Sequence, residues 1–282
     1  MNILILPHHP TWGDYLAKGF YSLGLMDITV NPATPKDFDL DLSPYDLIIA
    51  SITFVEAGKL IDLQNVLLID HNRWSLDHRL PTTHRPIIIV DERSPLEGGM
   101  LCQPKKGIHH IPNGIDLNFW RPSVTSRFGF ISCADIWNKA RYDQKRIDLL
   151  KEMQKFKEIP LVGYDIPAVE KDGVRNFYWK SKVFVLSYSL GLAPKEAMAC
   201  GLPVVTLLHP RNKKLISLHP ILNSLAFKKI EDAVVCLEEL STDKDFYTYC
   251  SNKCLELVYK KWSAFKMAKA YLKIIENYKL GV

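Results

Sequence analysis

One segment of the chain combines residue types that could hold an anionic ligand. Residues 183–206 read VFVLSYSLGLAPKEAMACGLPVVT, in which two apolar runs flank a glycine, a proline and a glutamate. Gly191 permits a tight turn, Pro194 suits the first turn of a helix because its missing N–H costs nothing there, and Gly201 fits the left-handed position that ends a helix. The pattern predicts a strand, a helix over Pro194–Cys200 and a second strand. Free N–H groups where such a helix begins form an anion site that suits a diphosphate.

Glu196 adds a second feature to the same segment. In the first turn of the predicted helix, its carboxylate could accept hydrogen bonds from the two hydroxyls of a ribose. A nucleotide diphosphate is a ligand that would use both features. An ordinary strand–helix–strand unit with a surface glutamate explains the same residues, and the residue types alone do not decide between the two.

The stretch GLAPKEAMACGLPVV at residues 191–205 resembles the donor-site signature of the GT-B glycosyltransferases of the large retaining family GT4. Other stretches agree with the family pattern in the same order: Ile111–Asp116 with Phe119, Gln144–Leu150, and Trp262 followed by a helix that contains Tyr271. The resemblance extends from Ile108 to the C-terminus, whereas residues 1–107 match only in general layout.

The resemblance implies an α/β fold of the GT-B type, in which two Rossmann-like domains face each other across a cleft and a C-terminal helix crosses back. Residues 1–122 would form the N-terminal, acceptor domain and residues 123–262 the C-terminal, nucleotide-sugar domain. Residues 263–282 would form the helix that packs back on the first domain.

It also implies roles for individual residues. Glu196 matches the glutamate that binds the nucleotide ribose, and Lys145 matches a lysine that binds the diphosphate and stabilises it as it leaves. The arginine expected five residues before that lysine would fall at Ala140, so Arg141 or Lys139 must supply the charge. The catalytic residues expected on this basis are Lys145, Arg141 and His71, and the donor-binding residues are Gly13, Tyr188, Gly191, Leu192, Ala193 and Glu196.

Two of these assignments come from the first half of the chain. His71 follows a predicted strand and resembles a strand-end histidine that lies near the reacting sugar in the family. Gly13 ends the stretch His8–Gly13 after the first strand. In a GT-B fold that loop faces the cleft, where a glycine would let the backbone approach phosphates. A structural loop explains the stretch equally well.

Tyr188 is a departure from the family pattern. The family usually carries two glutamates eight positions apart, and Tyr188 stands where the first would be, ahead of Glu196. That position normally helps to hold the donor sugar, so the departure bears on sugar identity. It also motivates a hypothesis from a different class, a non-catalytic protein that binds nucleotide sugars.

The sequence predicts catalysis without a metal ion and without a cofactor other than the co-substrate, a UDP- or GDP-linked sugar. Asp39 and Asp41 have the spacing of a metal-binding pair but lie in a polar loop, and lysine and arginine charge can replace the metal in balancing the leaving group. Cys250 and Cys254 could share one helical face. Without a partner motif, they and the other cysteines are expected to be reduced thiols.

The elements that must position these residues follow from the apolar pattern. Short aliphatic runs of the kind found in parallel sheets predict strands, and a helix is expected over Gly13–Leu25. A polar stretch at Arg121–Ser126 predicts a linker between two α/β halves, and the period over Trp262–Tyr278 predicts a packing helix. The predicted strands are Asn2–Leu6, Asp27–Val30, Leu47–Ser51, Val66–Asp70, Ile87–Asp91, Ile108–Pro112, Phe128–Ser132, Pro160–Tyr164, Val183–Ser187 and Leu202–Leu208.

The composition agrees with a globular protein that buries a core. Of 282 residues, 47% are apolar, and the formal net charge is +5, which is compatible with an anionic substrate, nucleic acid or an anionic membrane surface but selects none of them. No run of apolar residues is long enough for a membrane span, and the N-terminus does not resemble a signal peptide. We therefore expect a cytoplasmic protein.

The function expected from these observations is transfer of a sugar from a UDP- or GDP-linked donor to a hydroxyl acceptor, with retention at the anomeric carbon and no metal ion. The acceptor stays open among a glycan, a lipid-linked sugar and a small molecule. A hydroxymethylated pyrimidine in the DNA of a modified phage genome is a further alternative. A nucleotide-sugar epimerase of the same architecture is a third class of enzyme that the sequence leaves open.

Overall fold

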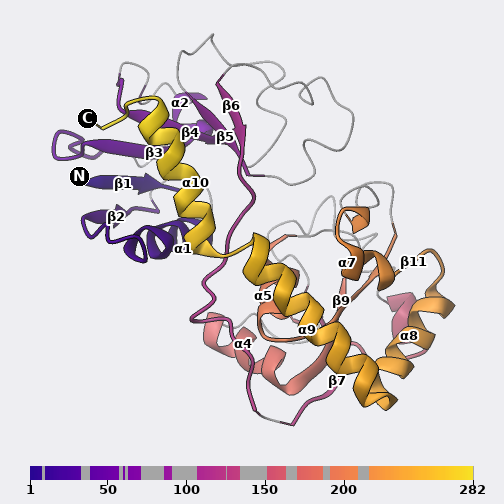
Figure 1. The fold of residues 1–282 in the computed structure, drawn as a ribbon. Coiled ribbons are helices and arrows are strands. Elements are labelled where there is room, and N and C mark those ends of the chain that lie inside the picture. Colours follow the sequence, from indigo (N-terminus) through magenta and orange to yellow (C-terminus); the bar gives the residue numbers. More distant parts are fainter. Residues whose placement is uncertain are drawn as a thin grey trace. The chain divides into compact units, whose positions relative to one another are not determined.

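The chain divides into two compact units in a computed structural model. Unit 1 is Met1–Asp116 together with Lys261–Val282, and unit 2 is Leu117–Lys260. The structure describes residues 1–7, 10–32, 39–56, 60, 63–70, 86–90, 107–124, 126–133, 151–162, 170–186, 191–208 and 216–281. Figure 1 shows that each unit contains a sheet with helices packed against it.

The described strands of unit 1 form one parallel sheet in the order β2-β1-β3-β4-β5-β6. Every residue of the two central strands β1 and β3 is buried, as expected for a sheet covered on both faces. The strands are β1 (Ile3–Leu6), β2 (Ile28–Val30), β3 (Leu47–Ser51), β4 (Val66–Asp70), β5 (Ile87–Ile89) and β6 (Ile108–His110).

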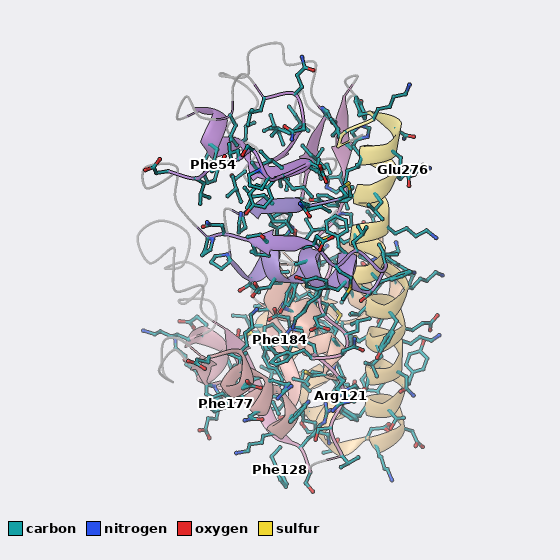
Figure 2. All side chains as sticks on the ribbon, turned by 90° about the vertical axis from the view of Figure 1, so that its left-hand side faces the viewer. Phe54, Arg121, Phe128, Phe177, Phe184 and Glu276 are labelled. Atoms are coloured by element: carbon teal, nitrogen blue, oxygen red, sulfur yellow. The ribbon has the colours of Figure 1, made fainter. Side chains whose placement is uncertain are left out.

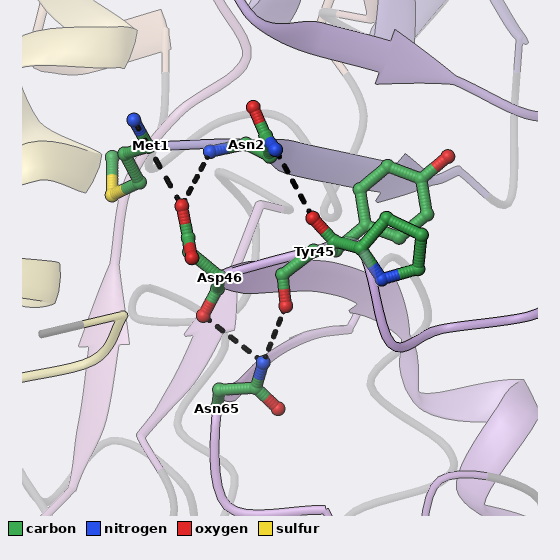
Figure 3. Close-up of polar contacts among 6 residues, drawn as sticks. Met1, Asn2, Tyr45, Asp46 and Asn65 are labelled. Carbon is green, nitrogen blue, oxygen red and sulfur yellow. Dashed lines mark hydrogen bonds and ion pairs between the residues drawn. The ribbon is translucent and has the colours of Figure 1, made fainter.

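Polar contacts hold together the amino ends of three of these strands (Figure 3). The Asp46 carboxylate accepts a 2.7 Å hydrogen bond from the backbone N–H of Asn2, at the start of β1. The Asn65 side-chain amide donates to the carbonyls of Tyr45 and Asp46, each at 3.0 Å. These bonds join the amino ends of β1, β3 and β4. The carboxyl ends of these strands lie at the opposite edge of the sheet, where longer connections can begin.

Three helices are described in unit 1: α1 (Pro10–Tyr21), α2 (Ile52–Glu56) and α10 (Ala264–Asn277). The C-terminal helix α10 packs on α1, and the rings of Trp12 and Tyr271 lie 6.3 Å apart between them. A side chain at Gly19 would collide with the backbone of Ala264, so the close approach of the two helices requires glycine. The C-terminal residues thus complete the N-terminal unit.

Unit 2 contains a second parallel sheet, with the described strands in the order β11-β10-β9-β7-β8. Its strands are β7 (Phe128–Cys133), β8 (Leu161–Val162), β9 (Ser181–Leu186), β10 (Val204–Leu207) and β11 (Ala226–Phe227). The helices with described bounds are α4 (Lys171–Lys180), α5 (Leu192–Ala199), α7 (Pro220–Ser224), α8 (Ile230–Thr242) and α9 (Lys244–Lys261).

Alternate residues of β9 face two different helical layers. Val183 and Val185 belong to a core cluster with Leu237 of α8, whereas the Phe184 ring meets Tyr178 of α4 at 5.8 Å. Figure 2 shows Phe184 inside unit 2. Phe128 begins the neighbouring strand at the surface and is 76% exposed. The sheet of unit 2 is therefore sandwiched between helices, like that of unit 1.

The predicted linker at Arg121–Ser126 lies inside unit 2, because the division between the units falls between Asp116 and Leu117. The residues after this division are anchored on α4. The Arg175 guanidinium stacks 4.1 Å from the centre of the Phe119 ring, and the Trp179 indole N–H donates a 2.7 Å hydrogen bond to the carbonyl of Arg121. The polar composition of this stretch predicted a linker. In the structure, aromatic packing against α4 instead holds the chain in place.

The predicted strands agree closely with those observed, whereas some helices differ. Helix α1 runs over Pro10–Tyr21 rather than Gly13–Leu25, because the chain turns at Ser22–Gly24, where Gly24 adopts a φ of 85°. Helices α2, α4, α7, α8 and α9 and the short strand β11 were not predicted. Among the described residues, no helix is both long and apolar enough to span a lipid bilayer.

Candidate functional site

The topology of unit 2 places a candidate site where β7 and β9 end. From β7 the chain moves to β8 on one side, and it later enters β9, β10 and β11 on the other side. Strands β7 and β9 are hydrogen-bonded neighbours, so the strand order reverses between them. In open parallel sheets, ligands bind in the crevice outside the carboxyl ends of the strands at such a point.

Both segments that the sequence analysis singled out leave the sheet at this point. The chain continues from Cys133, the last residue of β7, toward Arg141 and Lys145. From Leu186, the last residue of β9, it continues through Tyr188 to Gly191. Arg141, Lys145, Tyr188 and, in unit 1, His71 lie outside the described residues, and their roles stay predictions.

Helix α5 begins the described part of the site. Gly191 is its N-cap, with an extended backbone at φ −79° and ψ −151° and no side chain to accept hydrogen bonds from the first turn. The helix starts at Leu192, two residues before the predicted start, because Leu192 and Ala193 favour helix and Pro194 needs no N–H donor in the first turn. The N–H groups of Leu192 and Ala193 therefore belong to the helix start.

The earlier start corrects the expected place of Glu196. It is the fifth residue of α5, in the second turn rather than the first. Its side chain is also not a surface glutamate, since Glu196 is only 8% exposed. A buried carboxylate is costly unless its surroundings stabilise the charge, so this burial favours a specific role over a solvated surface position.

Lys195 is a buried charged residue that the sequence analysis did not single out. It is 2% exposed, among the largest fully buried side chains of the described residues. Long helical side chains lean toward the N-terminus of their helix, which directs Lys195 back toward the start of α5. The available signal was the pair Lys195-Glu196 inside an otherwise apolar stretch, where two adjacent charges interrupt residues that pack.

The carboxyl end of α5 has the predicted glycine stop. Gly201 adopts a φ of 85°, its N–H donates to the carbonyl of Met198 at 2.9 Å, and the N–H of Leu202 donates to the carbonyl of Ala197 at 3.0 Å. These two bonds are the Schellman arrangement that closes a helix at a left-handed glycine. Helix α5 is thus bounded by a glycine at each end, in two different backbone conformations.

Cys200, the last residue before that stop, is a buried thiol. Burial raises its pKa to about 12, while the nearby Arg127 guanidinium lowers it and the Glu196 carboxylate raises it. The thiol therefore stays protonated near neutral pH and is a poor nucleophile.

Gly13, which was predicted to approach phosphates, has a packing explanation. It lies inside α1 and is buried, and a Cβ there would come within 2.9 Å of the Pro7 ring and 3.0 Å of Val30. The missing side chain lets α1 pack against the end of β1 and against β2. A donor-binding role for Gly13 stays a prediction.

Unit 1 has a similar reversal of strand order between β1 and β3. At the carboxyl end of β3, the buried Ser51 hydroxyl accepts a 3.0 Å hydrogen bond from the Thr53 hydroxyl. The predicted His71 directly follows Asp70, the last residue of the adjacent strand β4. Ser51 and Thr53 are polar groups at this edge that the sequence analysis did not identify, because serine and threonine are common near strand ends.

Among the described residues, no group of three or more histidine, cysteine, aspartate or glutamate side chains could hold a metal ion. Asp41, half of the pair with metal-like spacing, accepts a 2.9 Å hydrogen bond from the N–H of Ser43, and this bond lowers the pKa of its carboxyl group. The carboxylate thus stabilises a local turn in the loop.

Comparison with known proteins gives structural similarity only. No family model matches the chain, and no curated protein matches it in sequence. Sucrose-phosphate synthase from Thermosynechococcus elongatus superposes with a TM-score of 0.61 at 12% identity, covering 98% of this chain and 100% of the other. Anabaena HepE, in complex with UDP and glucose, gives a TM-score of 0.58 at 12% identity, with 98% and 100% of the two chains covered.

A third similar structure is the DNA-modifying β-glucosyltransferase, the enzyme of T4 phage, which was solved with and without UDP-glucose. Its TM-score is 0.62 at 11% identity, with 98% of this chain and 99% of the other covered. Because all three similarities extend over nearly whole chains, the fold of this protein is GT-B, with Rossmann-like parallel sheets. The resemblance to family GT4 within that fold stays a prediction.

Proposed function

We propose that the protein is a glycosyltransferase that moves a sugar from a UDP- or GDP-linked donor to a hydroxyl acceptor. One observation carries the proposal: in a GT-B fold, at the strand-order reversal of unit 2, a helix with a glycine N-cap begins beside a buried glutamate. The helix start suits a diphosphate and the carboxylate suits a ribose diol. A nucleotide sugar contains both groups.

The proposed reaction breaks the bond between the anomeric carbon of the donor sugar and the diphosphate oxygen. The electron pair of that bond leaves with the nucleotide diphosphate, whose added charge is stabilised by Lys145, Arg141 and the start of α5. The acceptor oxygen bonds to the anomeric carbon, and its proton passes to the departing diphosphate oxygen on the same face of the sugar. His71 is proposed to lie near the reacting sugar, and Tyr188 beside it in place of a glutamate.

Two finer features of the reaction are proposed from the sequence resemblance. The stereochemistry is retention, with the acceptor attacking from the face that the leaving group departs. Charge balance by lysine and arginine makes the reaction independent of a divalent metal. NMR of the product would give the anomeric configuration, and unchanged turnover in excess EDTA is the result expected for the metal. An inverted product or a loss of turnover with EDTA would refute the corresponding feature.

UDP-glucose is the first donor to test, since the structures of HepE and the β-glucosyltransferase contain UDP with glucose or UDP-glucose. Thermal shift and release of free nucleotide diphosphate should be measured with UDP-, GDP- and ADP-sugars. We expect one nucleotide to raise the unfolding temperature and to be slowly hydrolysed. Release of nucleotide diphosphate also excludes an epimerase, which keeps its nucleotide sugar intact.

The variant Glu196→Ala tests the residue assignment. One hydrogen bond to a charged acceptor contributes about 1.5–3 kcal/mol, so loss of the proposed pair should weaken nucleotide binding by at least roughly 10- to 100-fold. Glu239→Ala, an exposed glutamate of α8, serves as the control and should bind like the wild type. Equal affinity in wild type and Glu196→Ala would refute the assignment.

A second candidate acceptor is DNA, favoured by the similarity to a DNA-modifying enzyme over nearly the whole chain and by the net charge of +5. An enzyme of this kind would transfer the sugar to a hydroxymethylated pyrimidine. Transfer from labelled UDP-glucose to hydroxymethylated duplex DNA, compared with unmodified DNA, tests it. Binding should fall steeply as salt rises, whereas a saccharide acceptor would show little salt dependence.

A further inference from the structure

Two side chains from other elements of unit 2 hold the carboxyl end of α5. The glycine stop leaves the carbonyls of Cys200 and Gly201 without partners in the helix, and Cys200 and Gly201 are both buried. The Cys200 carbonyl accepts a 2.6 Å hydrogen bond from Nη2 of Arg127. The Gly201 carbonyl accepts one of 2.6 Å from Oγ of Ser251. A buried carbonyl without a partner is costly, so both bonds matter for the helix position.

Arg127 and Ser251 both lie outside α5. Arg127 directly precedes β7, and Ser251 lies in α9. The second guanidinium nitrogen of Arg127 also approaches the Tyr247 hydroxyl of α9 at 3.4 Å. A cation at a helix carboxyl end is favoured by the helix dipole, so Arg127 contributes charge as well as a hydrogen bond.

Gly201 lies next to both side chains. A Cβ at this position would lie 3.4 Å from Nη2 of Arg127 and 3.5 Å from Oγ of Ser251, which are ordinary contact distances. The glycine is therefore required for its positive φ rather than for space. We name Arg127, Ser251 and Gly201 the α5 clamp.

The α5 clamp is linked to Glu196 through one helical turn. The N–H of Cys200 donates to the carbonyl of Glu196 at 3.0 Å, and every residue from Pro194 to Cys200 is buried. With eight residues, α5 is only about 12 Å long, at 1.5 Å per residue. A short helix packed on all sides moves as a unit. Displacing its carboxyl end would therefore displace Glu196 and the N–H groups after Gly191.

We propose that Arg127 and Ser251 are positioning residues of the donor site. They touch no ligand and act through α5, whose place in unit 2 sets where the diphosphate and ribose groups bind. The inference rests on the proposed function, since it assumes that α5 begins at the donor site. Loss of the clamp should raise the KM for the donor. Turnover at saturating donor should be much less affected, because α5 contacts the donor in both the bound ground state and the transition state.

The variants separate charge, hydrogen bonding and general stability. Arg127→Met removes the charge and keeps the alkyl stem, Arg127→Lys keeps the charge without the planar fork, and Ser251→Ala removes one hydrogen bond. The chain offers a matched control in Lys182, whose Nζ donates a 2.6 Å hydrogen bond to the carbonyl of Ser241 at the end of α8. Lys182 also lies 5.2 Å over the Tyr247 ring. Lys182→Met thus removes a cation from the carboxyl end of α8, a helix that is not part of the candidate site.

The affinity for UDP or GDP, whichever the wild type binds, should be measured by calorimetry well below the unfolding temperature. We expect Arg127→Met to bind about tenfold more weakly, which corresponds to ~1.4 kcal/mol. Arg127→Lys should recover part of the loss, Ser251→Ala should lose several-fold, and Lys182→Met should stay within about twofold. Equal weakening by Arg127→Met and Lys182→Met would mean general destabilisation and would overturn the inference.

Glu196→Ala belongs in the same series, because it separates failure of the clamp from failure of the proposed function. If the wild type binds neither nucleotide, the proposed function is wrong and the inference falls with it. If the wild type binds and Glu196→Ala does not, but Arg127→Met binds like the wild type, only the clamp is wrong.

A further measurement follows the clamp without activity. The backbone N–H groups of Cys200 and Gly201, which donate to carbonyls of α5, should exchange hydrogen faster in Arg127→Met than in Lys182→Met, as peptide mass spectrometry can show. Equal rates would contradict a hold on the end of α5.

Discussion

At the scale of single residues, the candidate site buries two charged side chains that are adjacent in sequence. Lys195 and Glu196 are adjacent charged side chains at 2% and 8% exposure. Neighbouring helical residues do not face each other, so the two side chains are stabilised by different surroundings. Charged side chains are rarely buried to this degree unless they interact with an opposite charge. The burial of these two adjacent residues is therefore the feature that indicates a functional site.

Two glycines among the described residues of unit 2 have a positive φ and give a residue-scale prediction. Gly201 has a φ of 85° and neighbours 3.4–3.6 Å from the position of a Cβ, which is ordinary contact distance, whereas Gly129 has a φ of 60° and open space around it. Alanine at either position costs about 1–2 kcal/mol for the left-handed backbone. We expect similar losses of stability at the two positions, because the added methyl group displaces no neighbour at either one. Urea unfolding measures both, and a much larger loss in Gly201→Ala would contradict this expectation.

At the scale of elements, α10 completes a unit from which it is distant in sequence. It packs on α1, and its N-cap Ser263 forms a parallel bridge with Ile115. The Ile115 N–H donates to the Trp262 carbonyl and the Ala264 N–H donates to the Ile115 carbonyl, each at 2.8 Å. The Ser263 hydroxyl caps α10 by accepting from the Lys266 N–H. Figure 2 shows Glu276 on the outer side of the helix, away from the sheet. Backbone pairing and capping thus set where the helix starts, and its apolar face sets how it packs.

The contact between α1 and α10 predicts a large effect of one methyl group. Gly19→Ala places a Cβ against the backbone of Ala264, where no flexible side chain can yield. The cost should be about 1–3 kcal/mol, the range for overpacked sites. Gly24→Ala is the comparison, since nothing lies within 4 Å of its Cβ and only its φ of 85° is strained. Protection of α10 amides from hydrogen exchange should fall in Gly19→Ala and not in Gly24→Ala.

The end of α10 meets the edge strand β6 through a titratable group. The Nε2 atom of His109 lies 3.2 Å from the Tyr278 hydroxyl, and burial lowers the pKa of this histidine below its ordinary value. A lowered pKa means that the unfolded chain binds the proton more readily than the folded one. The contribution of His109 to stability is therefore present above about pH 6.5, the ordinary histidine pKa, and is lost as the pH falls below it.

The test compares stability at pH 7.5 and pH 5.5. His109→Phe keeps an aromatic ring at 5.5 Å from the Tyr278 ring but cannot take up a proton. We expect this variant to lose less stability over the interval than the wild type does. His110→Gln, at the exposed neighbouring position, should follow the wild type. The same pH dependence in His109→Phe and wild type would contradict the assignment.

At the scale of the whole molecule, two α/β units repeat one plan. In each sheet the first strand lies inside, and the order reverses next to it, between β1 and β3 in unit 1 and between β7 and β9 in unit 2. Each unit thereby has its own reversal of strand order, and in open parallel sheets ligands bind outside the carboxyl ends of the strands at such a point. The GT-B fold supplies two such sites from one chain, and we propose that unit 2 uses its site for the donor and unit 1 uses its site for the acceptor.

Unit 1 is built from both ends of the chain, and this predicts the result of a truncation after Lys261. The removed residues include the buried Met267, Ala268, Tyr271, Ile274 and Ile275 of α10. Full burial of a large apolar side chain contributes about 1.5–3 kcal/mol, so the loss approaches the entire stability of a domain, about 5–15 kcal/mol. Limited proteolysis should digest residues 1–116 and spare residues 117–260. Survival of both units would show that α10 is dispensable for unit 1.

The sequence by itself determined most of the strands and the glycine stop of α5. Aliphatic runs such as Leu47–Ser51 and Val66–Asp70 match the observed strands, because burial on both faces leaves no polar alternation to confuse the pattern. Gly201 and the helix before it were also predictable, since the stop depends on the local backbone preference of one residue. The resemblance of the segment at 191–205 likewise predicted a GT-B fold.

Only the tertiary structure decided which strands are neighbours, and with that the location of the crevice. Strand order, the burial of Lys195 and Glu196, and the hold of Arg127 and Ser251 on α5 all join residues that are far apart in sequence or buried by distant elements. For the same reason the units divide after Asp116 and not at the polar stretch Arg121–Ser126, since aromatic packing on α4 outweighs local polarity. Local patterns determine whether a segment forms a helix or a strand, and long-range packing determines which other segments it contacts.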